Sequence, residues 1–449
     1  MELKIGEIYK LKIIDITHKG QGVGKIEGLT IFVDGAMSGD VVEIEIQTLK
    51  SNYAIGKLQS IIEPSPDKVS PPCPEFEKCG GCVFQNISKT AQAKIKKKFV
   101  VDSLERIGGF DGMESFVKDT QVMDEPMRYR NKAQYKISKD AVGFYAINTH
   151  HVIDIKDCLN QPQSCVQVIE CIRKIKNEKM LSIYDEKKHR GQLRGVVQRT
   201  TQQGDEMIVL VVTEINKKQE AKLIQLFSKI LPSLKSLNIN INTKKGNQVM
   251  GNHTYCIYGE PTIQEKLMEL KFIISPRSFF QVNTRQTEVL YTLAGDMAGL
   301  DGTQVLWDLY CGIGTIGLSL AHKAKSVIGI EIVPEAIEDA KINAQANDIT
   351  NASFLCGKAE VLIDNLVKNQ ENPDVVIVDP PRKGLEQNVI DKLVEVQVPK
   401  VVYVSCNPAS MARDMKLFVA GGYQMEEVVP VDMFPETGHV ECAVLMSRV

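Results

Sequence analysis

The stretch VLWDLYCGIGTIG, from Val305 to Gly317, decides the fold. Its first five residues are mostly apolar and read as a buried strand, and the glycines that follow require a tight turn into a helix. Glu331 ends the next apolar segment, at the spacing that is typical of a nucleotide-type cofactor pocket. The stretch therefore predicts the first strand–turn–helix unit of a doubly wound α/β sheet.

The same alternation continues toward the carboxyl terminus. Strands are expected at 305–309, 326–332, 352–355, 374–378 and 400–405, and helices at 315–323, 334–346, 359–369, 386–396 and 408–420. Two further strands, at 423–431 and 440–446, are expected to form an antiparallel edge pair. This region is therefore predicted to be a Rossmann-like α/β domain with a mostly parallel sheet.

The amino-terminal region has a different pattern. Short alternating segments separated by glycine turns predict a small β-barrel of four or five strands, a module that often binds RNA; the candidates are Ile5–Ile16, Leu29–Val33, Val41–Ile46 and Ala54–Ile62. A proline-rich connector at 64–72 follows the barrel. Residues 120–272 read as a mixed α+β region whose strand order the pattern does not specify.

A helix is expected at 88–107. Its apolar stripe contains Ile95, Phe99, Leu104 and Ile107. The lysines at 94 and 96–98 fall largely off that stripe, so they are expected on its polar side.

Composition limits the function classes. The 449 residues are too many for one core, and the net charge of −2 means that phosphate binding must rely on local basic patches. The first residues, Met1–Ile5, resemble neither a signal nor a transit peptide, and no apolar run is long enough to span a bilayer. We therefore expect a cytoplasmic protein that does not bind membranes, and the odd total of eleven cysteines argues against a disulfide framework.

The glycine turn is compatible with two cofactors. Gly312–Gly317 satisfies the dinucleotide fingerprint literally, but Asp308 would repel a pyrophosphate seated on the helix that follows. That carboxylate would favour the cationic methionine end of S-adenosylmethionine. An S-adenosylmethionine pocket is therefore preferred over a nicotinamide pocket or a turn without a ligand.

Three side chains at strand ends are candidates for chemistry. Asp379 is held by the two prolines of Asp379-Pro380-Pro381-Arg382 at the same sheet edge as Asp308. Cys406 precedes an expected helix, whose amino terminus would lower the thiol pKa and make it a nucleophile, although most lone cysteines are inert. Glu441 alternates into an apolar strand, so burial would raise its pKa and make it a usable base; His439 beside it is interpreted as structural.

Cysteines at Cys73-x5-Cys79-x2-Cys82 form a metal-binding signature that needs a fourth ligand. Cys158 is the leading candidate, because Cys165 and Cys171 fall on an apolar helical stretch. Four thiolates suit zinc as well as an iron–sulfur cluster, so ligand count does not decide between them.

The segment Met127–Lys132 interleaves cations with an aromatic residue. That pattern is typical of a single-stranded nucleic-acid surface, and a merely solvated face is the alternative.

Taken together, these motifs resemble the RNA uracil-5-methyltransferase family that carries an amino-terminal TRAM barrel and an iron–sulfur cluster. The resemblance covers nearly the whole chain. It rests on the cysteine motif at 73–82, Phe280–Asn283, Asp308–Gly312, Asp379–Arg382, Ser405–Pro408 and His439–Glu441. It implies a TRAM barrel at 1–62, a central domain with the cluster at 63–90 and 121–272, and a methyltransferase domain at 91–120 and 273–449.

The resemblance also implies roles for individual residues. Cys73, Cys79, Cys82 and Cys158 would hold a [4Fe–4S] cluster, and S-adenosylmethionine would be contacted by Gln281, Tyr310, Thr315, Glu331 and Asp379. Cys406 would be the nucleophile and Glu441 the base. Some members place an acid after the strand at 352–355 to bind adenine; this chain has Gly357–Glu360 there, with Glu360 or a backbone group as the substitute.

The implied activity is methyl transfer to C5 of uridine in RNA, with 23S ribosomal RNA as the leading substrate and transfer RNA as the alternative. The target base is expected to be flipped out of its stack, and the protein is expected to be a monomer. Two interpretations of other classes stay open at this point: an iron–sulfur oxidoreductase that uses nicotinamide, and a non-catalytic RNA-binding factor.

Overall fold

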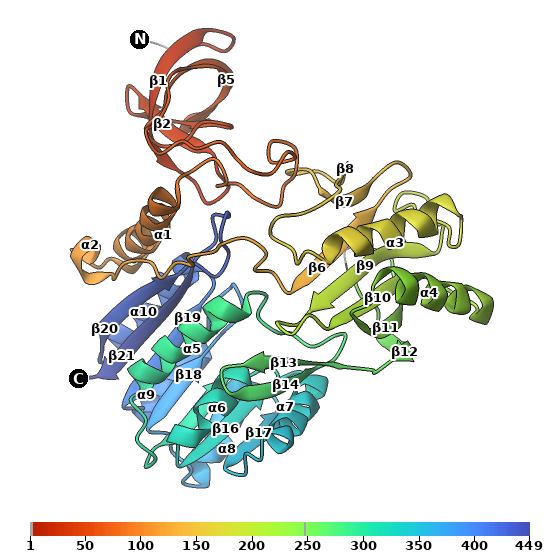
Figure 1. Cartoon of the computed structure of the whole chain (residues 1–449). Coiled ribbons are helices and arrows are strands. Elements are labelled where there is room, and N and C mark those ends of the chain that lie inside the picture. The colour runs from red at the N-terminus through yellow and green to blue at the C-terminus, as the bar shows by residue number, and fades with distance from the viewer. Residues whose placement is uncertain (1–2, 247) are drawn as a thin grey trace.

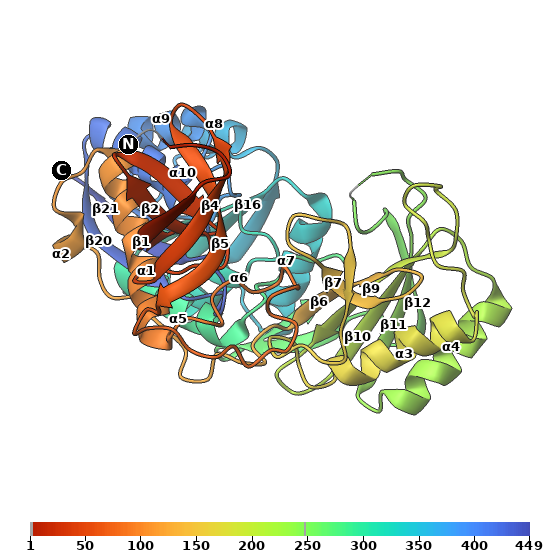
Figure 2. The same ribbon diagram turned by 90° about the horizontal axis from the view of Figure 1, so that it is seen from above.

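The computed structural model describes residues 3–246 and 248–449; residues 1, 2 and 247, which fall within the predicted barrel and central region, lie outside this description. Figure 1 shows a barrel that stands above the carboxyl-terminal domain, with a central α+β domain at its side. Figure 2, seen from above, shows the barrel over the carboxyl-terminal sheet and the central domain extending sideways. Within the described ranges, none of the helices combines the length and apolar character that a membrane span requires.

The amino-terminal strands close into a barrel in the order β1-β2-β3-β5-β4. Their bounds are β1 (Ile8–Ile16), β2 (Gly22–Ile26), β3 (Leu29–Val33), β4 (Val41–Leu49) and β5 (Tyr53–Glu63). Alternate residues such as Ile13, Ile31 and Ile44 are fully buried inside, which confirms the predicted barrel. The sequence pattern predicts a turn rather than a strand at β2, because Gly22 and Gly24 are typical turn residues. Gly24 is instead required for close packing, since a Cβ there would lie 2.6 Å from Leu11 Cδ1.

Helix α1 (Lys89–Ser103) confirms the predicted helix, and a π-helical turn, η1 (Leu104–Gly108), and the short α2 (Met113–Phe116) follow it. Ser88 caps the helix by accepting a hydrogen bond from the Ala91 amide. Val100 and Leu104 pack into the same core cluster as Trp307 of the carboxyl-terminal sheet. The placement of Lys96 on the polar side was wrong: it is fully buried and forms an ion pair with Asp432.

The central domain is a seven-stranded sheet in the order β12-β11-β10-β9-β6-β7-β8. Its elements are β6 (Lys132–Ile137), β7 (Val142–Tyr145), β8 (Val152–Asp154), α3 (Cys165–Asn177), β9 (Leu193–Thr200), β10 (Glu206–Val212), α4 (Lys217–Ile230), β11 (Leu234–Ile241) and β12 (His253–Gly259). The helices α3 and α4 cover one face. From the other face, Val197 and Val209 join the core of the carboxyl-terminal domain, so the two domains share a hydrophobic cluster.

A hairpin, β13 (Ile263–Leu267) and β14 (Leu270–Ile274), leads into helix α5 (Thr284–Ala298) and the carboxyl-terminal sheet. That sheet has the order β17-β16-β15-β18-β19-β21-β20. Its strands are β15 (Val305–Leu309), β16 (Ser326–Glu331), β17 (Ala352–Cys356), β18 (Val375–Val378), β19 (Lys400–Ser405), β20 (Tyr423–Val431) and β21 (Glu441–Arg448). The helices are α6 (Thr315–Leu320) with the 3₁₀ turn η2 (Ala321–Lys323), α7 (Pro334–Ala346), α8 (Ala359–Lys368), α9 (Gln387–Val396) and α10 (Pro408–Ala420).

This arrangement confirms the predicted doubly wound domain. The first five strands run parallel, and the two last strands add an antiparallel pair in which β21 lies between β19 and β20. Strand β15 pairs with β16 on one side and with β18 on the other, so the chain reverses its winding there. Ligands bind in such sheets beyond the carboxyl ends of the strands at this reversal point.

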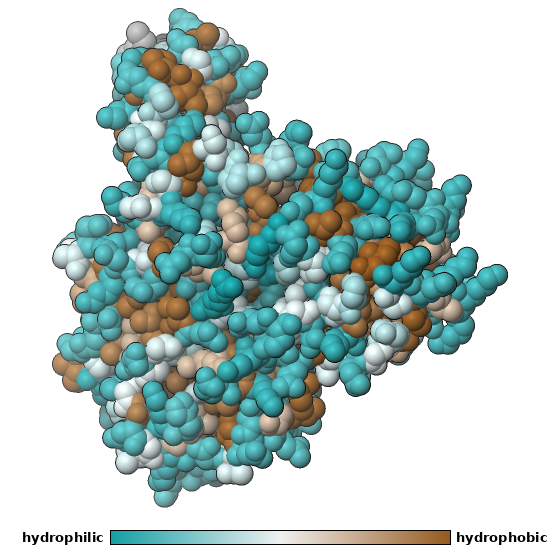
Figure 3. Space-filling model, in the orientation of Figure 1, coloured by the Kyte–Doolittle hydropathy of each residue, from teal (hydrophilic) through white to brown (hydrophobic). Residues whose placement is uncertain are grey.

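The face of the molecule shown in Figure 3 is mostly hydrophilic, and its hydrophobic side chains gather in small separate groups, one of them on the barrel. Scattered exposed hydrophobic groups are normal on protein surfaces and need no special explanation.

Candidate active site

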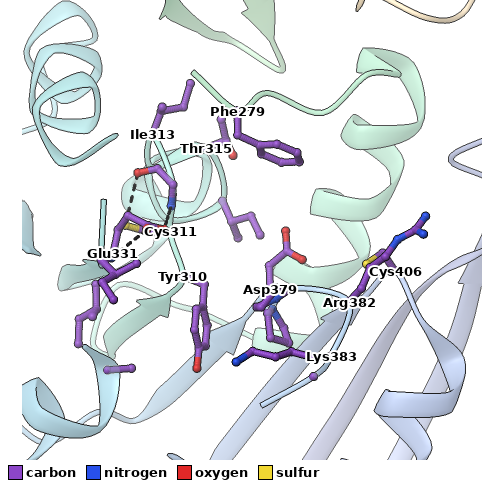
Figure 4. Close-up of a pocket in the computed structure, with 18 of the residues that line it drawn as sticks. Phe279, Tyr310, Cys311, Ile313, Thr315, Glu331, Asp379, Arg382, Lys383 and Cys406 are labelled. Carbon is purple, nitrogen blue, oxygen red and sulfur yellow. Dashed lines mark hydrogen bonds between the residues drawn. The ribbon is translucent and has the colours of Figure 1, made fainter. Parts of the chain in front are cut away.

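A cavity of about 910 Å³ opens at the carboxyl edge of β15, β16, β18 and β19. All the predicted cofactor-contacting and catalytic residues line it: Gln281, Tyr310, Thr315, Glu331, Asp379, Cys406 and Glu441. Figure 4 shows how they are spread, with Glu331 at one end, Tyr310 and Asp379 in the middle and Cys406 at the other end. A long ligand could therefore lie with its one end at Glu331 and its reactive end beside Cys406.

The glycine turn forms the floor of the cavity. Tyr310, Gly312 and Gly314 all adopt positive φ angles, 65°, 55° and 82°, which explains the glycines after the strand. The turn delivers Thr315 to the start of α6, where its hydroxyl lies 2.8 Å from the hydroxyl of Tyr291.

Asp308 does not take the place expected for it. Its carboxyl group is fully buried, does not line the cavity, and accepts a hydrogen bond of 2.8 Å from the Gly317 amide. Burial raises its pKa to about 7. The expectation that its charge faces the methionine end of a cofactor is therefore wrong; the residue ties the start of α6 to β15.

Glu331 is oriented by the backbone around it. Its two carboxylate oxygens accept hydrogen bonds from the amides of Gly312 (3.3 Å), Ile332 (2.8 Å) and Val333 (2.9 Å). Glu360 and the backbone of Gly357 line the same end of the cavity. Both of the substitutes considered for adenine recognition are thus close to Glu331.

Asp379, in the middle of the cavity in Figure 4, and Gln281 also line it. Asp379 follows β18 directly, and desolvation of its carboxyl group raises the pKa to about 7. Gln281 reaches the cavity from the loop before α5, and its carbonyl accepts a hydrogen bond of 2.9 Å from Asn131 Nδ2. A carboxyl group with this pKa changes its charge easily when a cation binds next to it.

Cys406 lies between two hollows. It lines the cofactor-sized cavity and also a groove of about 920 Å³ that runs between the barrel and the carboxyl-terminal domain. Asn407 caps α10 just behind it, with its side chain accepting from the Ala409 amide. The thiol is therefore accessible from both sides.

The expected low pKa of Cys406 is wrong. Desolvation, followed by the nearby charges of Glu441 and Asp379, raises the pKa of the thiol to about 11, and these effects outweigh the Arg382 guanidinium and a backbone hydrogen bond at Cys406. In the free protein at neutral pH the group is a thiol rather than a thiolate.

Glu441 opens strand β21 and is 3% exposed. Burial raises its pKa well above the ordinary value, with Asp379 adding to the rise, as its apolar strand predicts. His439 is neutral near pH 7, because burial and then the Arg382 charge lower its pKa to about 4. Its Nδ1 lies 3.4 Å from an Arg382 nitrogen, so it is part of the site rather than only structural.

Two residues of the site were given no role from the sequence. Phe279 is 67% exposed and reaches over the cavity in Figure 4. Arg382 lies beside Cys406 in the same view and lines both hollows. Arg382 could have been found as the cation of the Asp-Pro-Pro-Arg turn, whereas no pattern distinguishes Phe279 from its buried neighbour Phe280.

The four predicted metal ligands lie together, away from this cavity. Cys73, Cys79, Cys82 and Cys158 all line one pocket of about 450 Å³. The alternatives lie elsewhere: Cys171 is buried in the α3 core, and Cys165 donates to the Asp157 carboxylate at 3.2 Å. In residues 3–246 and 248–449, no three Cys, His, Asp or Glu side chains converge closely enough to hold a single metal ion.

Polar groups in this pocket suit thiolates. Gln85 Nε2 and Asn160 Nδ2 both donate to Cys82 Sγ, at 3.2 and 3.1 Å. The amide oxygens of Asn160 and Gln161 are buried without a hydrogen-bond partner. Such donors to sulfur accompany cysteine-bound metal clusters.

The basic segment after 127 does not form the surface predicted for it. Arg128 pairs with Asp157 at 2.6 Å, Tyr129 is buried and donates to the Pro435 carbonyl at 3.3 Å, and Asn131 binds the Gln281 loop. The guanidinium of Arg130 lies about 6 Å from the rings of Tyr129 and Phe434. Instead of a nucleic-acid surface or a solvated face, the segment joins the cysteine pocket to the cofactor cavity.

Comparisons with known proteins agree with this geometry. A family model described as tRNA (Uracil-5-)-methyltransferase matches residues 110–449, and the TRAM domain matches residues 2–58. A Clostridium tetani protein named as an uncharacterized RNA methyltransferase is 43% identical, covering 99% of this chain and 97% of its own length. A Caldanaerobacter subterraneus protein of the same name is 41% identical, with coverage of 100% and 99%.

A solved structure extends the likeness to three dimensions. It is Pyrococcus abyssi tRNA (uracil-54, C5)-methyltransferase in complex with S-adenosyl-L-homocysteine, 28% identical to this chain. The superposition has a TM-score of 0.77 and covers 97% of this chain and 99% of the other.

Proposed function

We propose, from the premise that this chain belongs to the tRNA (uracil-5-)-methyltransferase family, that it methylates C5 of uridine in RNA through a covalent bond from Cys406 to C6. Membership makes the chain an S-adenosylmethionine-dependent RNA methyltransferase. A nicotinamide oxidoreductase and a non-catalytic RNA-binding factor are therefore the weaker interpretations. The nucleophile, the base and the RNA substrate are argued below from the site.

One observation carries the proposal: Cys406 lies where the cavity and the groove meet. Across the groove, the barrel contributes Lys25 and Phe32, and α1 contributes Phe99. A uridine flipped out of an RNA loop could enter along the groove while the cofactor occupies the cavity. The sulfur would then face the base on one side and the cofactor on the other.

The reaction needs a nucleophile because C5 of uracil is itself unreactive. Attack of the Cys406 sulfur on C6 pushes the C5–C6 electron pair toward O4, and the enolate so formed makes C5 nucleophilic. Bound S-adenosylmethionine supplies the methyl group as an electrophile. Glu441 then takes the C5 proton, and the electron pair restores the C5–C6 double bond as the C6–sulfur bond breaks and releases the thiolate.

The charges of the site support formation of the thiolate during the reaction. With a pKa of about 11, the free thiol is protonated at neutral pH. A positive charge beside it must therefore lower this pKa before the sulfur attacks. Arg382 already lowers that pKa and lies next to Cys406 in Figure 4. A sulfonium cation in the cavity would add to this effect and would also favour the charged forms of Asp379 and Glu441.

We assign the cofactor contacts along the cavity. Glu331 would accept hydrogen bonds from the ribose hydroxyls, since its carboxylate is already oriented by three amides. Glu360 or the Gly357 backbone would meet the adenine edge. Gln281, Tyr310, Thr315 and Asp379 would contact the remainder of the cofactor.

Phe279 would stack on the target base. Its ring is 67% exposed and lines the cavity, so its face is free to contact a bound base. Stacking on an aromatic ring suits an extruded base.

We further propose that Cys73, Cys79, Cys82 and Cys158 hold a [4Fe–4S] cluster. All four cysteines line one pocket of about 450 Å³, where Gln85 and Asn160 donate hydrogen bonds to Cys82 Sγ. The choice of a cluster over a single zinc ion follows the family resemblance. Iron and acid-labile sulfide in anaerobically purified protein, with zinc absent, are the expected result; stoichiometric zinc would contradict it.

For the substrate we propose 23S ribosomal RNA. The family resemblance supports it, while the family description and the solved relative, both named for tRNA, favour transfer RNA as the second candidate. Mapping 5-methyluridine in both RNAs from a deletion strain separates them. Loss confined to transfer RNA would overturn the ribosomal assignment.

The mechanism is tested with RNA that contains 5-fluorouridine, whose C5 fluorine blocks the final elimination. The unmutated protein is expected to form a stable covalent adduct with this RNA, and Cys406→Ala is expected to form none and to lose all turnover. Cys356→Ala, which removes an exposed cysteine, is the control and should behave as the unmutated protein. Adduct formation by Cys406→Ala would exclude Cys406 as the nucleophile.

A further inference from the structure

The connection between β20 and β21 is held at five successive carbonyls. We call Asp432–Thr437 the strap. Its carbonyls accept hydrogen bonds from four distant segments. Side chains donate to the first four carbonyls: Gln286 to Asp432 (3.1 Å), Asn283 to Met433 (3.0 Å), Lys96 to Phe434 (3.0 Å) and Tyr129 to Pro435 (3.3 Å). The backbone amides of Val83 (3.0 Å) and Phe84 (3.1 Å) donate to the fifth, Glu436. Loops usually leave such groups to water, so this one is unusually fixed.

The strap leads directly into His439 and Glu441 of the proposed active site. Phe434 packs edge-on against His439 with ring centroids 5.8 Å apart, and Glu441 begins β21 four residues after the strap ends. Gly438, which lies between the strap and His439, packs against the barrel: a Cβ on it would lie 2.0 Å from the His18 carbonyl oxygen. Cys406 directly follows another strand, β19, and takes no part in the hydrogen bonds that hold the strap.

The cysteine loop runs directly into the strap. Val83 and Phe84, which donate to the Glu436 carbonyl, are the two residues after Cys82. Phe84 is fully buried, and the Glu436 backbone has a φ of 65°, an uncommon value for this residue type. The junction therefore fixes the two loops to each other.

Gln92 of α1 joins the two loops a second time. Its Nε2 donates to the carbonyls of Phe84 and Ile87 and to the Glu436 carboxylate, at 3.0, 3.0 and 3.1 Å. Its Oε1 accepts from the Glu436 amide at 3.3 Å. The side chain is 4% exposed, so these bonds are shielded from water.

We propose that the strap couples the four-cysteine pocket to Glu441 and His439, so that the metal centre supports the active site structurally and Gln92 is a positioning residue for the base. The proposal rests on the proposed function for the role of Glu441 and for the presence of metal. Its consequence is specific: loosening the strap slows the step that needs Glu441 more than the attack by Cys406.

The first experiment measures amide hydrogen exchange in the full-length protein before and after anaerobic metal removal, and in Cys82→Ser. Exchange in peptides that cover 430–441 is expected to accelerate at least tenfold, while peptides covering β15 and β16 keep their rates. Faster exchange confined to 73–85, with the strap unchanged, would overturn the coupling.

The second experiment uses Gln92→Met, which keeps the side-chain volume and removes all four hydrogen bonds, including the one that the buried Glu436 carboxylate accepts. Adduct formation with 5-fluorouridine RNA is expected to stay within twofold, while release of methylated product from normal RNA slows at least tenfold. Lys94→Ala, an exposed residue on the same helix, is the matched control. Equal slowing of both steps, or no slowing of release, would show that Gln92 is merely structural.

The two kinds of failure can be told apart. If Cys406 is not the nucleophile, Cys406→Ala still forms an adduct or the unmutated protein forms none, yet the exchange experiment still reports on the strap. If the coupling is wrong, the adduct forms normally and the strap does not respond to the metal.

Discussion

Cys406 lies among groups that oppose its ionisation. Desolvation and the carboxylates of Glu441 and Asp379 raise the pKa of the thiol, and the Arg382 guanidinium only partly compensates. A thiol that is neutral at rest is less prone to adventitious oxidation than a thiolate. A cationic cofactor beside it would raise the thiolate fraction, so its reactivity should increase on cofactor binding.

The first prediction concerns this thiol. Alkylation of Cys406 by iodoacetamide, followed by mass spectrometry against pH, is expected to reach half its maximal rate near pH 11 in the free protein. S-adenosylmethionine, whose sulfur is cationic, should lower that midpoint by about one unit, equivalent to about 1.4 kcal/mol. S-adenosylhomocysteine, whose sulfur is neutral, should shift it less.

Cys256, in β12 of the central domain and outside the cavity, is the internal reference, since its rate should not respond to either ligand. Glu441→Gln removes one of the charges that raise the thiol pKa, so its midpoint should also fall. A midpoint below pH 8 in the free protein would contradict this electrostatic account.

The second prediction concerns Glu441. Glu441→Gln keeps the size of the side chain but cannot accept the C5 proton, so a methylated protein–RNA adduct is expected to accumulate on normal RNA. Denaturing gel electrophoresis with labelled methyl groups measures it. Because burial raises the Glu441 pKa, release by the unmutated protein should slow as pH falls, starting well above pH 4.5. Unimpaired release by Glu441→Gln would remove the residue from this role.

At the scale of elements, the turn between β15 and α6 depends on close packing. Gly317 lets the first turn of α6 approach Asp308, and a Cβ at this position would lie 2.8 Å from Asp308 Oδ2 and 3.0 Å from Val327 Cγ1. Both neighbours belong to buried strands and cannot move far.

The third prediction follows from that packing. Gly317→Ala is expected to push α6 away from β15, to lower stability by about 1–3 kcal/mol and to weaken S-adenosylmethionine binding by at least tenfold. Isothermal titration and urea unfolding measure the two effects. Ser319→Ala on the same helix, which loses only a hydrogen bond to the Thr315 carbonyl, is the control. Unchanged affinity in Gly317→Ala would show that the turn tolerates displacement.

At the scale of the whole molecule, the barrel and the carboxyl-terminal domain form one groove around Cys406. With a net charge of −2, the protein cannot attract RNA through its overall field, so local contacts along the groove must supply the affinity. Figures 1 and 2 show the barrel placed over this sheet, as such a groove requires.

The fourth prediction tests the groove. Lys25→Ala and Phe32→Ala, both in the barrel wall, are expected to raise the KM for RNA by about 5- to 50-fold. Phe32→Ala removes an aromatic ring on which a base can stack, a contact that contributes about 1–3 kcal/mol per base, and Lys25→Ala removes a cation that can pair with a phosphate. The Kd for S-adenosylmethionine should not change. Lys57→Ala, exposed on the barrel but outside the groove, should leave the KM unchanged. Equal effects of Lys25→Ala and Lys57→Ala would mean that only general charge matters.

Much of the fold follows from short patterns. The strand Val305–Leu309 with its glycine turn, and the edge pair at the carboxyl terminus, appear where periodicity places them, because strand and helix signals are local. Strand β2 was missed because its glycines serve close packing rather than a turn. The order of the central sheet depends on contacts between distant strands, which no periodicity encodes.

The residues of the cofactor cavity could also be identified from the sequence, since parallel strands deliver their carboxyl ends to one edge. The protonation and the partners of the charged residues could not be predicted from the sequence. Asp308 binds an amide instead of facing a ligand, Lys96 is buried against a partner 336 positions away, and the Cys406 pKa rises where a helix end alone would lower it.

The chain's local patterns were sufficient to place Cys406, Glu441 and a glycine turn around one sheet edge, because periodicity and turn chemistry act over a few residues. Three features arise only when the chain packs. They are the protonation of Cys406, its position between the cavity and the groove, and the hydrogen bonds from Val83 and Phe84 to the strap. The pKa of Cys406 depends on burial and on the charges of Asp379, Arg382 and Glu441, and desolvation has no meaning until the chain has closed around the group. The groove and the junction with the strap join segments that lie hundreds of positions apart in the sequence.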